Sequence, residues 1–431
     1  MSRSAAHDVV VVGAGPAGLA AAAAASAASA GVRVLLVDDN PWVGGQIWRG
    51  EERNPSVQEA TYWRAKVRET GVEVLCGARV FDAPEPGVLL AETMTGVRRL
   101  PYWRLILATG ARERFLPFPG WTLPNVMGAG GLQAMVKSGM PVDGKRVVVA
   151  GTGPLLMAVA AYLATHGAKV EVLAEQAPFT RLAAFSTQLL RMPAKIKQAL
   201  TLRRQLAGVP YLTSCWPVAA SGKETLERVT LTRGGRKWDV ACDYLACGFH
   251  LIPNVELPNV MGCKLENGFV AVDEWQSTSV TQVYCAGEPT GIGGVELAIL
   301  EGQVAGLAAA GRQSDARRLF ASRSNYRRFA AAMDRAFELR PELRDVPAET
   351  LLCRCEDVTV GRAQAHHSWR EAKLHTRCGM GPCQGRVCGG AASFLFGWQT
   401  ESSRPPVFPA PVADLAAAPY DRHSAIVEER V

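Results

Sequence analysis

The sequence has little that suits a membrane or a nucleic acid. Its 431 residues contain no uninterrupted apolar run long enough to span a bilayer. The Ala-rich stretch 9–31 is broken by Gly13, Gly15 and Gly18, which are typical of a strand, a turn and a helix and not of a signal peptide. The net charge is only +7, and basic residues gather mainly at 312–340. We interpret that run as a solvated helix face or a contact with an acidic partner subunit, so no nucleic acid is expected as a ligand.

The cysteines lack the pattern of a secreted disulfide framework. Six of the 11 are scattered, several of them inside apolar runs, and are expected to be buried thiols: Cys76, Cys215, Cys242, Cys247, Cys263 and Cys285. The other five gather near the C-terminus, where thiolates at such spacing usually hold a metal. Reduced thiols beside a cofactor site predict a cytoplasmic protein.

Two segments repeat the order strand, glycine-rich turn, helix, strand. The first runs from Val9 to Val37 and the second from Arg146 to Leu173. The first strand, Val9–Val12, is a continuous β-branched run, as in buried parallel sheets. With 48% hydrophobic residues over this length, the chain should form two or three domains of the α/β class with parallel sheets.

The first glycine-rich turn predicts a dinucleotide site. Gly13 permits the tight turn, Gly15 lets the backbone approach a pyrophosphate, and Gly18 allows close packing of helix on strand. The next strand ends in two acids, and one of them would bond a ribose diol. Asp38 is preferred because it directly follows the apolar run, and Asp39 is the alternative. The loop residues expected to bind the cofactor are Gly13, Gly15, Pro16, Ala17 and Gly18.

Three later segments complete the pattern of a flavoprotein: Gly44-Gly45-Gln46-Ile47, Ala108-Thr109-Gly110 and Gly287-Glu288. In this order they resemble the two-dinucleotide-domain flavoproteins that include glutathione and thioredoxin reductases. The resemblance implies FAD as cofactor, with Glu288 at the position where the family usually has an Asp that bonds the ribityl chain. The family's redox-active Cys-x-x-Cys is missing from both of its usual places, so a disulfide reductase is not expected. The cofactor-binding residues implied here are Gly45, Gln46, Ala108, Thr109, Gly110, Gly287 and Glu288.

The second glycine-rich turn departs from the fingerprint. Gly151 and Gly153 are present, but Leu156 stands at the third position, where a large side chain pushes the helix away from the strand. Glu175 lies near the end of the following strand. In the resembling family this domain binds NAD(P)H. Here NAD(P), another adenine nucleotide and a purely structural domain all stay open.

The C-terminal cysteines resemble the bacterioferritin-associated-ferredoxin-like [2Fe-2S] domain. The relevant stretches read Cys353-Arg-Cys355 and Cys378-Gly-Met-Gly-Pro-Cys383-Gln-Gly-Arg-Val-Cys388. Thiolates are suitable soft ligands for iron, and four are needed where five are available. By spacing, the second pair could be Cys378 and Cys383 or Cys383 and Cys388. The resemblance favours Cys353, Cys355, Cys383 and Cys388, with Cys378 as the alternative, and a zinc site is the competing chemistry.

Three further stretches, Gly44–Arg49, Arg112–Val126 and Ala246–Asn254, make the resemblance more specific. With the cysteines, they are similar to the larger FAD subunit of bacterial multi-subunit amine and opine dehydrogenases, a group with opine oxidase, D-hydroxyproline dehydrogenase and hydrogen cyanide synthase. The resemblance implies an electron-transfer subunit with FAD and a [2Fe-2S] cluster. Its implied partner is a flavin-containing β subunit of the amino-acid oxidase type, which oxidises the substrate C–N bond, and a small ferredoxin-like γ subunit is a second candidate.

Two other functions stay open, and no residue is assigned a catalytic role. The chain could be a self-contained NAD(P)H-dependent flavin reductase that feeds a partner, or a non-catalytic assembly subunit. The expected domains are an FAD-binding domain at 1–118 and 264–312, an NAD(P)-binding-like domain at 119–263, a helical linker at 313–350, the [2Fe-2S] module at 351–398 and a Pro-rich, extended tail at 399–431.

Overall fold

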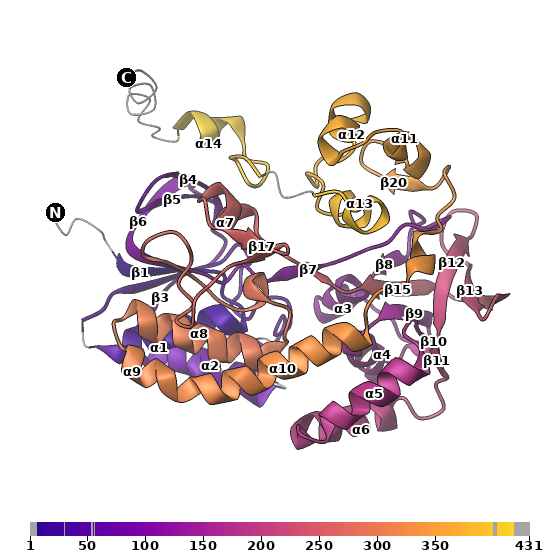
Figure 1. Ribbon diagram of the computed structural model, residues 1–431, viewed down its shortest axis with the longest axis horizontal. Coiled ribbons are helices and arrows are strands. Elements are labelled where there is room, and N and C mark those ends of the chain that lie inside the picture. The colour runs from indigo at the N-terminus through magenta and orange to yellow at the C-terminus, as the bar shows by residue number, and fades with distance from the viewer. Residues whose placement is uncertain (1–6, 30, 53–54, 56, 400–402, 418–431) are drawn as a thin grey trace. The chain divides into compact units, whose positions relative to one another are not determined.

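The computed structural model describes residues 7–29, 31–52, 55, 57–399 and 403–417, which form two compact units (Figure 1). The first unit holds the described residues of the ranges 1–110, 253–326 and 401–431, and the second those of 111–252 and 327–400. The predicted α/β class is confirmed, and the C-terminal cysteine region contains short helices as expected. The finer division into five segments stays a prediction.

The first unit is built on a parallel sheet with an antiparallel extension. The strand order is β3-β2-β1-β6-β5-β4, and β19 also pairs with β6. The second half of β6 runs parallel to β1, with Val10 opposite Leu105, and its first half runs antiparallel to β5. The strands are β1 (His7–Val12), β2 (Val34–Val37), β3 (Glu73–Leu75), β4 (Arg79–Glu85), β5 (Val88–Thr93), β6 (Gly96–Leu107), β17 (Leu265–Glu266), β18 (Phe269–Val270) and β19 (Val283–Cys285).

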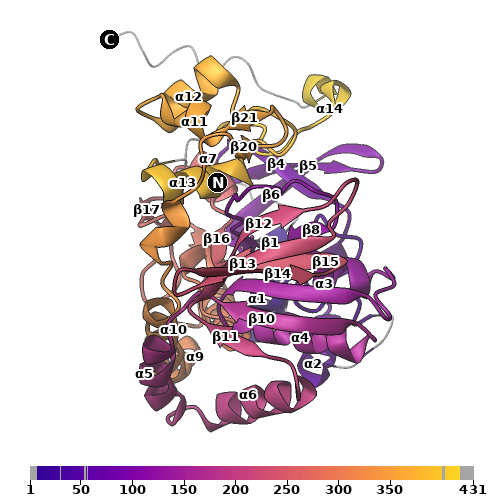
Figure 2. The same ribbon diagram turned by 90° about the vertical axis from the view of Figure 1, so that its right-hand side faces the viewer.

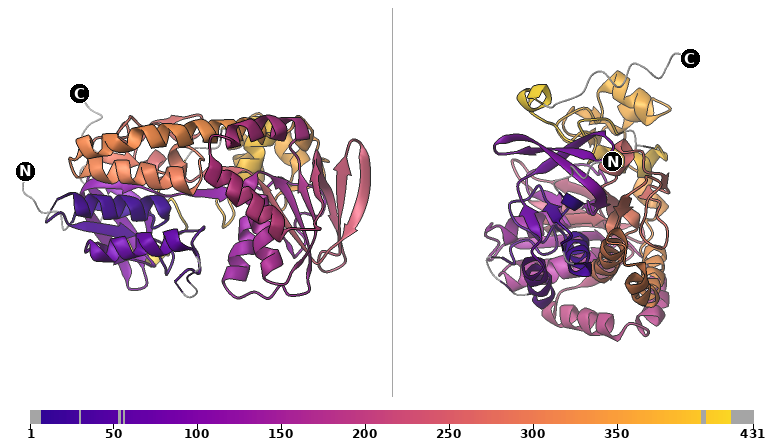
Figure 3. Two further views of the ribbon diagram at one scale, coloured as in Figure 1. Left: turned by 90° about the horizontal axis from the view of Figure 1, so that it is seen from below. Right: turned by 90° about the vertical axis from the view of Figure 1, so that its left-hand side faces the viewer.

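The helices α8, α1 and α2 of the first unit lie side by side when seen from below (Figure 3). A Cβ atom on Gly302 or Gly306 would come within 2.2 Å of a backbone oxygen of α1, so only glycine permits this approach. The helices are α1 (Pro16–Ala28), α2 (Gln58–Glu69), α7 (Glu256–Val260), α8 (Val295–Ala309), α9 (Gln313–Ala316) and α14 (Val412–Ala417), with 3₁₀ turns at Glu288–Thr290 and Arg317–Leu319.

The second unit repeats the parallel sheet and adds an antiparallel one (Figure 2). The parallel order is β11-β10-β9-β15-β8, and the antiparallel order is β12-β13-β14. The strands are β7 (Ala111–Glu113), β8 (Val126–Gly128), β9 (Arg146–Thr152), β10 (Lys169–Glu175), β11 (Tyr211–Thr213), β12 (Cys215–Ser221), β13 (Arg228–Arg233), β14 (Arg236–Ala241), β15 (Tyr244–Phe249), β20 (Leu351–Cys353) and β21 (Val358–Thr359). The helices are α3 (Ala129–Lys137), α4 (Pro154–Thr165), α5 (Phe179–Leu189), α6 (Pro193–Gln205), α11 (Val360–Gln364), α12 (Trp369–Thr376) and α13 (Cys388–Phe396), with a 3₁₀ turn at Pro341–Arg344.

The chain passes between the units at four points, and two of them lie within β16 (Leu251–Pro253) and α10 (Phe320–Ala336). The cysteine module, residues 351–396, shares one apolar core with the second unit, since Trp121 and Phe249 pack in the same cluster as Leu352 and Trp369. The indole N–H of Trp121 also donates to the carbonyl of Leu351, at 2.6 Å. The module is therefore an integral part of the second unit and not a loose appendage.

The Pro-rich tail is not extended throughout. The N–H of Val407 donates to the carbonyl of Phe81 at 2.8 Å, and the short helix α14 follows. Residues 400–402 and 418–431 of the predicted tail lie outside the described residues. Among the residues that are described, no helix combines the length and the apolar character that a membrane crossing needs.

Candidate cofactor sites

The first glycine loop has the close packing that its sequence predicts. A Cβ atom on Gly13 would lie 2.2 Å from the carbonyl oxygen of Ala108, and one on Gly18 would lie 1.7 Å from that of Gly13. At Gly15, in contrast, the nearest atom to such a Cβ is the Cα of Gly45, 3.9 Å away. Gly15 precedes the first residue of α1, whose N-terminus has no side-chain cap among the described residues. An uncapped helix N-terminus that follows a glycine without a close steric contact fits the pyrophosphate of a dinucleotide.

Of the two acids after β2, only Asp38 turns toward this loop. Its side chain is buried and accepts a hydrogen bond from the N–H of Ala14. Its second carboxylate oxygen accepts from the N–H and the side-chain amide of Asn40, both at 2.8 Å. Asp39 is exposed and faces Arg79 across 3.9 Å. The geometry thus favours Asp38 as the residue that would bond a ribose diol, a role that stays a prediction.

A second glycine turn packs directly on the first. The N–H of Gly44 donates to the carbonyl of Ala14, and a Cβ on Gly45 would lie 2.9 Å from the Cα of Gly15. Gln46 follows on the surface and accepts a hydrogen bond from Arg49. The Nε of Arg49 is buried and has no hydrogen-bond partner among the described residues. A buried guanidinium nitrogen without a partner at a glycine turn suits a ligand oxygen, and no motif in the sequence indicated it.

Ala108, Thr109 and Gly110 follow β6 at the carboxyl edge of the first sheet. The Thr109 hydroxyl donates to the carbonyl of Asn254 at 2.6 Å, and the Asn254 amide donates back to the carbonyl of Thr109 at 2.9 Å. This reciprocal pair fixes the turn that follows the strand. Ligands of doubly wound folds bind at this edge. The three residues therefore lie at the edge where a cofactor is expected to bind.

Gly287 and Glu288 follow β19, far along the chain from the first glycine loop, but Gly287 packs against the same helix, α1. A Cβ on Gly287 would lie 2.8 Å from the Cβ of Ala17 in α1. Burial raises the pKa of Glu288 to about 7. The buried Glu301 of α8 holds this turn, since it accepts hydrogen bonds from the Gly287 N–H and the Thr290 hydroxyl. Sequence reasoning missed Glu301, although an acid in the middle of an Ala- and Gly-rich helix could have revealed it.

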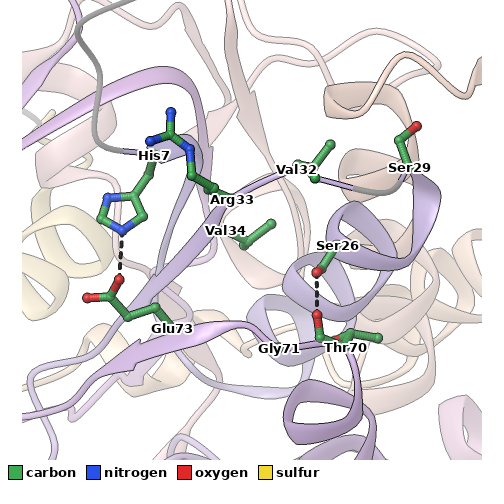
Figure 4. A pocket seen from close by; sticks show the side chains of 10 residues that line it. His7, Ser26, Ser29, Val32, Arg33, Val34, Thr70, Gly71 and Glu73 are labelled. Atoms are coloured by element: carbon green, nitrogen blue, oxygen red, sulfur yellow. Dashed lines mark hydrogen bonds and ion pairs between the residues drawn. The ribbon is translucent and has the colours of Figure 1, made fainter.

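A shallow depression of about 440 Å³ lies at the opposite edge of the first sheet (Figure 4). His7 and Val34, at the amino ends of β1 and β2, line it together with Ser26 and Thr70. A hydrogen bond of 2.9 Å joins His7 to Glu73. Because dinucleotides bind at the carboxyl ends of parallel strands, this depression is not the cofactor site.

The second glycine loop is packed differently. A Cβ on Gly151 would lie 1.9 Å from the carbonyl of Gly248, so its first glycine is as necessary as Gly13. Leu156 stands at the position that Gly18 has in the first loop, and it is only 1% exposed. Its side chain fills the space into which a closely packed helix would move. Glu175 is fully buried and accepts hydrogen bonds of 2.8 Å from the Thr152 hydroxyl and two backbone N–H groups, those of Gly153 and Ala177. Burial raises its pKa to about 7, against the effect of these donors.

The structure brings all five C-terminal cysteines together. The Sγ atoms of Cys353, Cys378 and Cys388 lie within 4.8 Å of one another and are buried. The Sγ atoms of Cys355 and Cys383 are 3.8 Å apart, nearer the surface. Hydrogen bonds from the Cys378 and Cys388 thiols hold the pKa of Cys353 well below its usual range. The Cys388 thiol lowers the pKa of Cys383 to about 5.

Glycines allow the loop between these cysteines to wrap closely. A Cβ on Gly381 would lie 2.4 Å from the Cβ of Cys355, and one on Gly379 would lie 2.6 Å from the ring of Trp369. Five sulfurs in a glycine-rich wrap are a donor set that fits an iron–sulfur cluster, and also zinc. Cys378, which the sequence treated as the alternative ligand, belongs to the tight buried trio. The choice of ligands stays a prediction.

Known proteins resemble this chain over most of its length. Residues 7–307 match the model of the pyridine nucleotide-disulphide oxidoreductase family. Hydrogen cyanide synthase subunit HcnB of Pseudomonas aeruginosa is 33% identical, with 89% of this chain and 91% of the relative covered. One subunit of the opine oxidase of Rhizobium meliloti is 31% identical, with 96% and 88% covered. The predicted resemblance to these subunits is confirmed.

Solved structures share the fold at lower sequence identity. L-proline dehydrogenase from P. horikoshii matches with a TM-score of 0.68 at 18% identity, over 95% of this chain and 79% of that one. Thioredoxin reductase from T. acidophilum matches with a TM-score of 0.52 at 20% identity, over 70% and 97%. The glycine loops, the sheet order and the matched residues agree: the chain is an oxidoreductase with a flavoprotein fold and belongs to the pyridine nucleotide-disulphide oxidoreductase family.

Proposed function

We propose that this chain is the FAD- and [2Fe-2S]-containing electron-transfer subunit of a multi-subunit amino-acid or opine dehydrogenase. The observation that carries the proposal is the gathering of five cysteine sulfurs in a glycine-wrapped site on the second unit. Free buried cysteines pack as small apolar side chains and have no reason to converge, so five sulfurs in one place indicate a site for a metal or a cluster. Cys353, Cys355, Cys383 and Cys388 would hold the cluster, with Cys378 as the alternative.

The first glycine loop supports FAD as the second group. Gly15 and the start of α1 would hold the pyrophosphate, Asp38 the ribose, and Gly287 and Glu288 the ribityl end. When bound, FAD accepts electrons in pairs and a [2Fe-2S] cluster carries them singly. The residues of this chain contribute the binding, the orientation and the burial of both groups.

A partner subunit is part of the proposal. The relatives are named as subunits, of hydrogen cyanide synthase and of opine oxidase. Among the described residues, no acid, base or carboxylate clamp is assigned to a substrate. We therefore assign oxidation of the substrate C–N bond to a flavin-containing β subunit of the amino-acid oxidase type. A small ferredoxin-like γ subunit is a candidate for an additional partner.

Metal analysis of single-cysteine variants tests the cluster. The purified chain should hold about two irons and two acid-labile sulfides. Cys355→Ser should lose nearly all of this iron, because it removes a proposed ligand, and Cys378→Ser should keep it. Loss of iron in Cys378→Ser with retention in Cys388→Ser would select the alternative ligand set. A preparation that contains zinc and no iron would exclude the cluster altogether.

Purification with the partner tests the role. The chain, expressed with the product of the adjacent gene, should form a complex that reduces a dye when amino acids or opines are supplied. Cys355→Ser should stop transfer beyond the flavin while the complex still assembles. If the partner alone reduces the physiological acceptor as fast as the complex does, the chain has an assembly role only.

A further inference from the structure

The carboxyl edge of the second sheet, where a dinucleotide would bind in this fold, is occupied by the chain itself. We call residues 337–350 the arm, because they lead from α10 to β20 and its Cys353. The carbonyl oxygen of Phe337, the first residue of the arm, accepts a hydrogen bond of 2.7 Å from Nε2 of His250. It also accepts one of 3.3 Å from the side-chain amide of Gln176, and the Thr152 hydroxyl lies at the same distance.

These three contacts come from the positions that define the site. Thr152 is the middle residue of the glycine loop Gly151–Gly153, and Gln176 directly follows Glu175 at the end of β10. His250, which directly follows β15, has a backbone φ of +66°, a conformation that is rare for a residue other than glycine. Burial lowers the pKa of its imidazole, so a neutral ring donates this bond from Nε2.

The side chain of Gln176 is fully buried, and both the nitrogen and the oxygen of its amide hydrogen-bond to the arm. Its NH₂ group donates to the carbonyls of Phe337 and Glu338, and its oxygen accepts from the N–H of Arg340 at 3.2 Å. Arg340 returns a hydrogen bond to the carbonyl of Gln176 and stacks over Trp216, with its guanidinium carbon 4.1 Å from the ring centre. The arm is therefore held by main-chain groups and not only by side-chain packing.

Apolar contacts close the same region. Phe337 is 6% exposed and packs edge-on against Phe185 of α5, with ring centres 5.8 Å apart. Ala332 and Ala336, from the end of α10, join the same cluster, and α5 lies beside α10 in Figure 2. A side chain of this size, already buried, leaves no route for a nicotinamide or adenine ring at its position.

The acid of the second loop, Glu175, is fully buried and already accepts three hydrogen bonds. Both oxygens of Glu175 accept hydrogen bonds from the loop and from the backbone after it. Glu175 stands where an acid would bind the ribose of a dinucleotide. Its hydrogen bonds instead hold the loop whose Thr152 hydroxyl contacts the carbonyl of Phe337.

We propose that the second dinucleotide loop holds the arm of its own chain in place of NAD(P) or another adenine nucleotide. The second domain then serves as the anchor of the segment that leads to Cys353 and Cys355. This inference rests on the second unit alone and does not require the cluster or the partner subunit. It also removes the self-contained NAD(P)H-dependent reductase from the candidate functions.

Hydrogen–deuterium exchange of the full, flavin-loaded chain tests the inference. Addition of 1 mM NADH or NADPH should leave the exchange of peptides at 150–157 and 335–342 unchanged and should not bleach the flavin absorbance. His250→Ala should raise the exchange rate of peptide 335–342 roughly fivefold to tenfold, as the loss of one anchoring hydrogen bond predicts. His250→Gln, which keeps a donor, should restore at least part of the protection.

The matched control is His166→Ala, since the ring of His166 hydrogen-bonds to a carbonyl of its own helix, that of Tyr162. It should leave the exchange of 335–342 at the wild-type rate. If His250→Ala fails to fold, Gln176→Ala is the second variant. It removes the acceptor of the Arg340 N–H and should likewise raise the exchange rate of peptide 335–342. Protection of 150–157 by NADH in the wild type, or an unchanged arm in both anchor variants, would overturn the inference.

Discussion

The two glycine loops begin alike and end differently. A Cβ atom added to Gly13 would lie 2.2 Å from a backbone carbonyl oxygen, and one added to Gly151 would lie 1.9 Å from another. Both strands therefore turn in the same way. At the third position the first loop has Gly18 pressed against Gly13, whereas the second has the buried Leu156. The middle glycine is uncrowded in both loops, since a Cβ on Gly15 would have its nearest neighbour at 3.9 Å and one on Gly153 none within 4 Å. The second loop differs in that its Thr152 hydroxyl lies 3.3 Å from the carbonyl oxygen of Phe337. A shared fingerprint thus fixes a backbone turn and does not by itself fix a ligand.

The largest contrast should come from alanine at one glycine of each loop. Gly18→Ala forces the loop to shift, because its Cβ would lie 1.7 Å from the carbonyl of Gly13. We expect loss of the bound flavin and a fall of at least about 3 kcal/mol in the free energy of unfolding. Gly153→Ala meets no atom within 4 Å and should cost only about 1–2 kcal/mol, the strain of its positive φ.

Flavin absorbance per chain and urea unfolding measure both effects. A Gly18→Ala protein that keeps a full complement of flavin would contradict the assignment of the first loop. Equal destabilisation by the two substitutions would remove the contrast between the loops.

A smaller effect is expected when the fingerprint of the second loop is restored. Leu156→Gly should not create NADH binding in a calorimetric titration, because the arm and not Leu156 closes the site. It should lower the free energy of unfolding by about 3 kcal/mol, from the cavity and the flexible glycine. Leu155→Gly, at the neighbouring and more exposed position, is the control and should cost about 1 kcal/mol. Micromolar NADH binding by Leu156→Gly would show that the leucine was the barrier.

The smallest effect concerns pH. Burial raises the pKa of Glu175 from an ordinary 4.5 to about 7, so the folded state keeps this proton to higher pH than the unfolded state. The resulting stabilisation is complete below pH 4.5 and is lost as the pH rises through 7. Between pH 5 and 7 the wild type should lose up to about 1.4 kcal/mol of unfolding free energy per pH unit relative to Glu175→Gln.

Urea unfolding at several pH values measures this slope. Glu171→Gln changes an exposed acid on the same strand and is the control. Identical slopes for the wild type and Glu175→Gln would contradict a raised pKa at this position.

Local sequence signals predicted the strands and turns, but they could not always decide which of two adjacent residues belongs to a site. The β-branched run Val9–Val12 and the glycines after it identified β1 and α1 because their signals lie within one supersecondary unit. The sequence ranked Asp38 over Asp39 only by position. The structure separates them, since one carboxylate accepts from Ala14 and the other faces solvent.

The cysteines show the same limit at longer range. Their spacing predicted a metal site, but spacing alone could not rank Cys378 against Cys388. Folding places both beside Cys353, because the turn at Arg377, with a φ of +64°, and the glycines after it direct the chain back. The resemblance to known subunits predicted the most about function, and the ligand choice still awaits the metal analysis.

The sequence by itself determined the α/β class, the two glycine turns, the flavoprotein family and the presence of a cysteine site. Each of these depends on short motifs that can be read within the chain, without knowledge of which distant residues come into contact. Only the tertiary structure decided that the second loop receives the arm, because Thr152 and Phe337 are 185 positions apart. No periodicity or motif encodes a contact between a loop hydroxyl and a distant main-chain carbonyl, and it forms only when β9, β10 and α10 pack together.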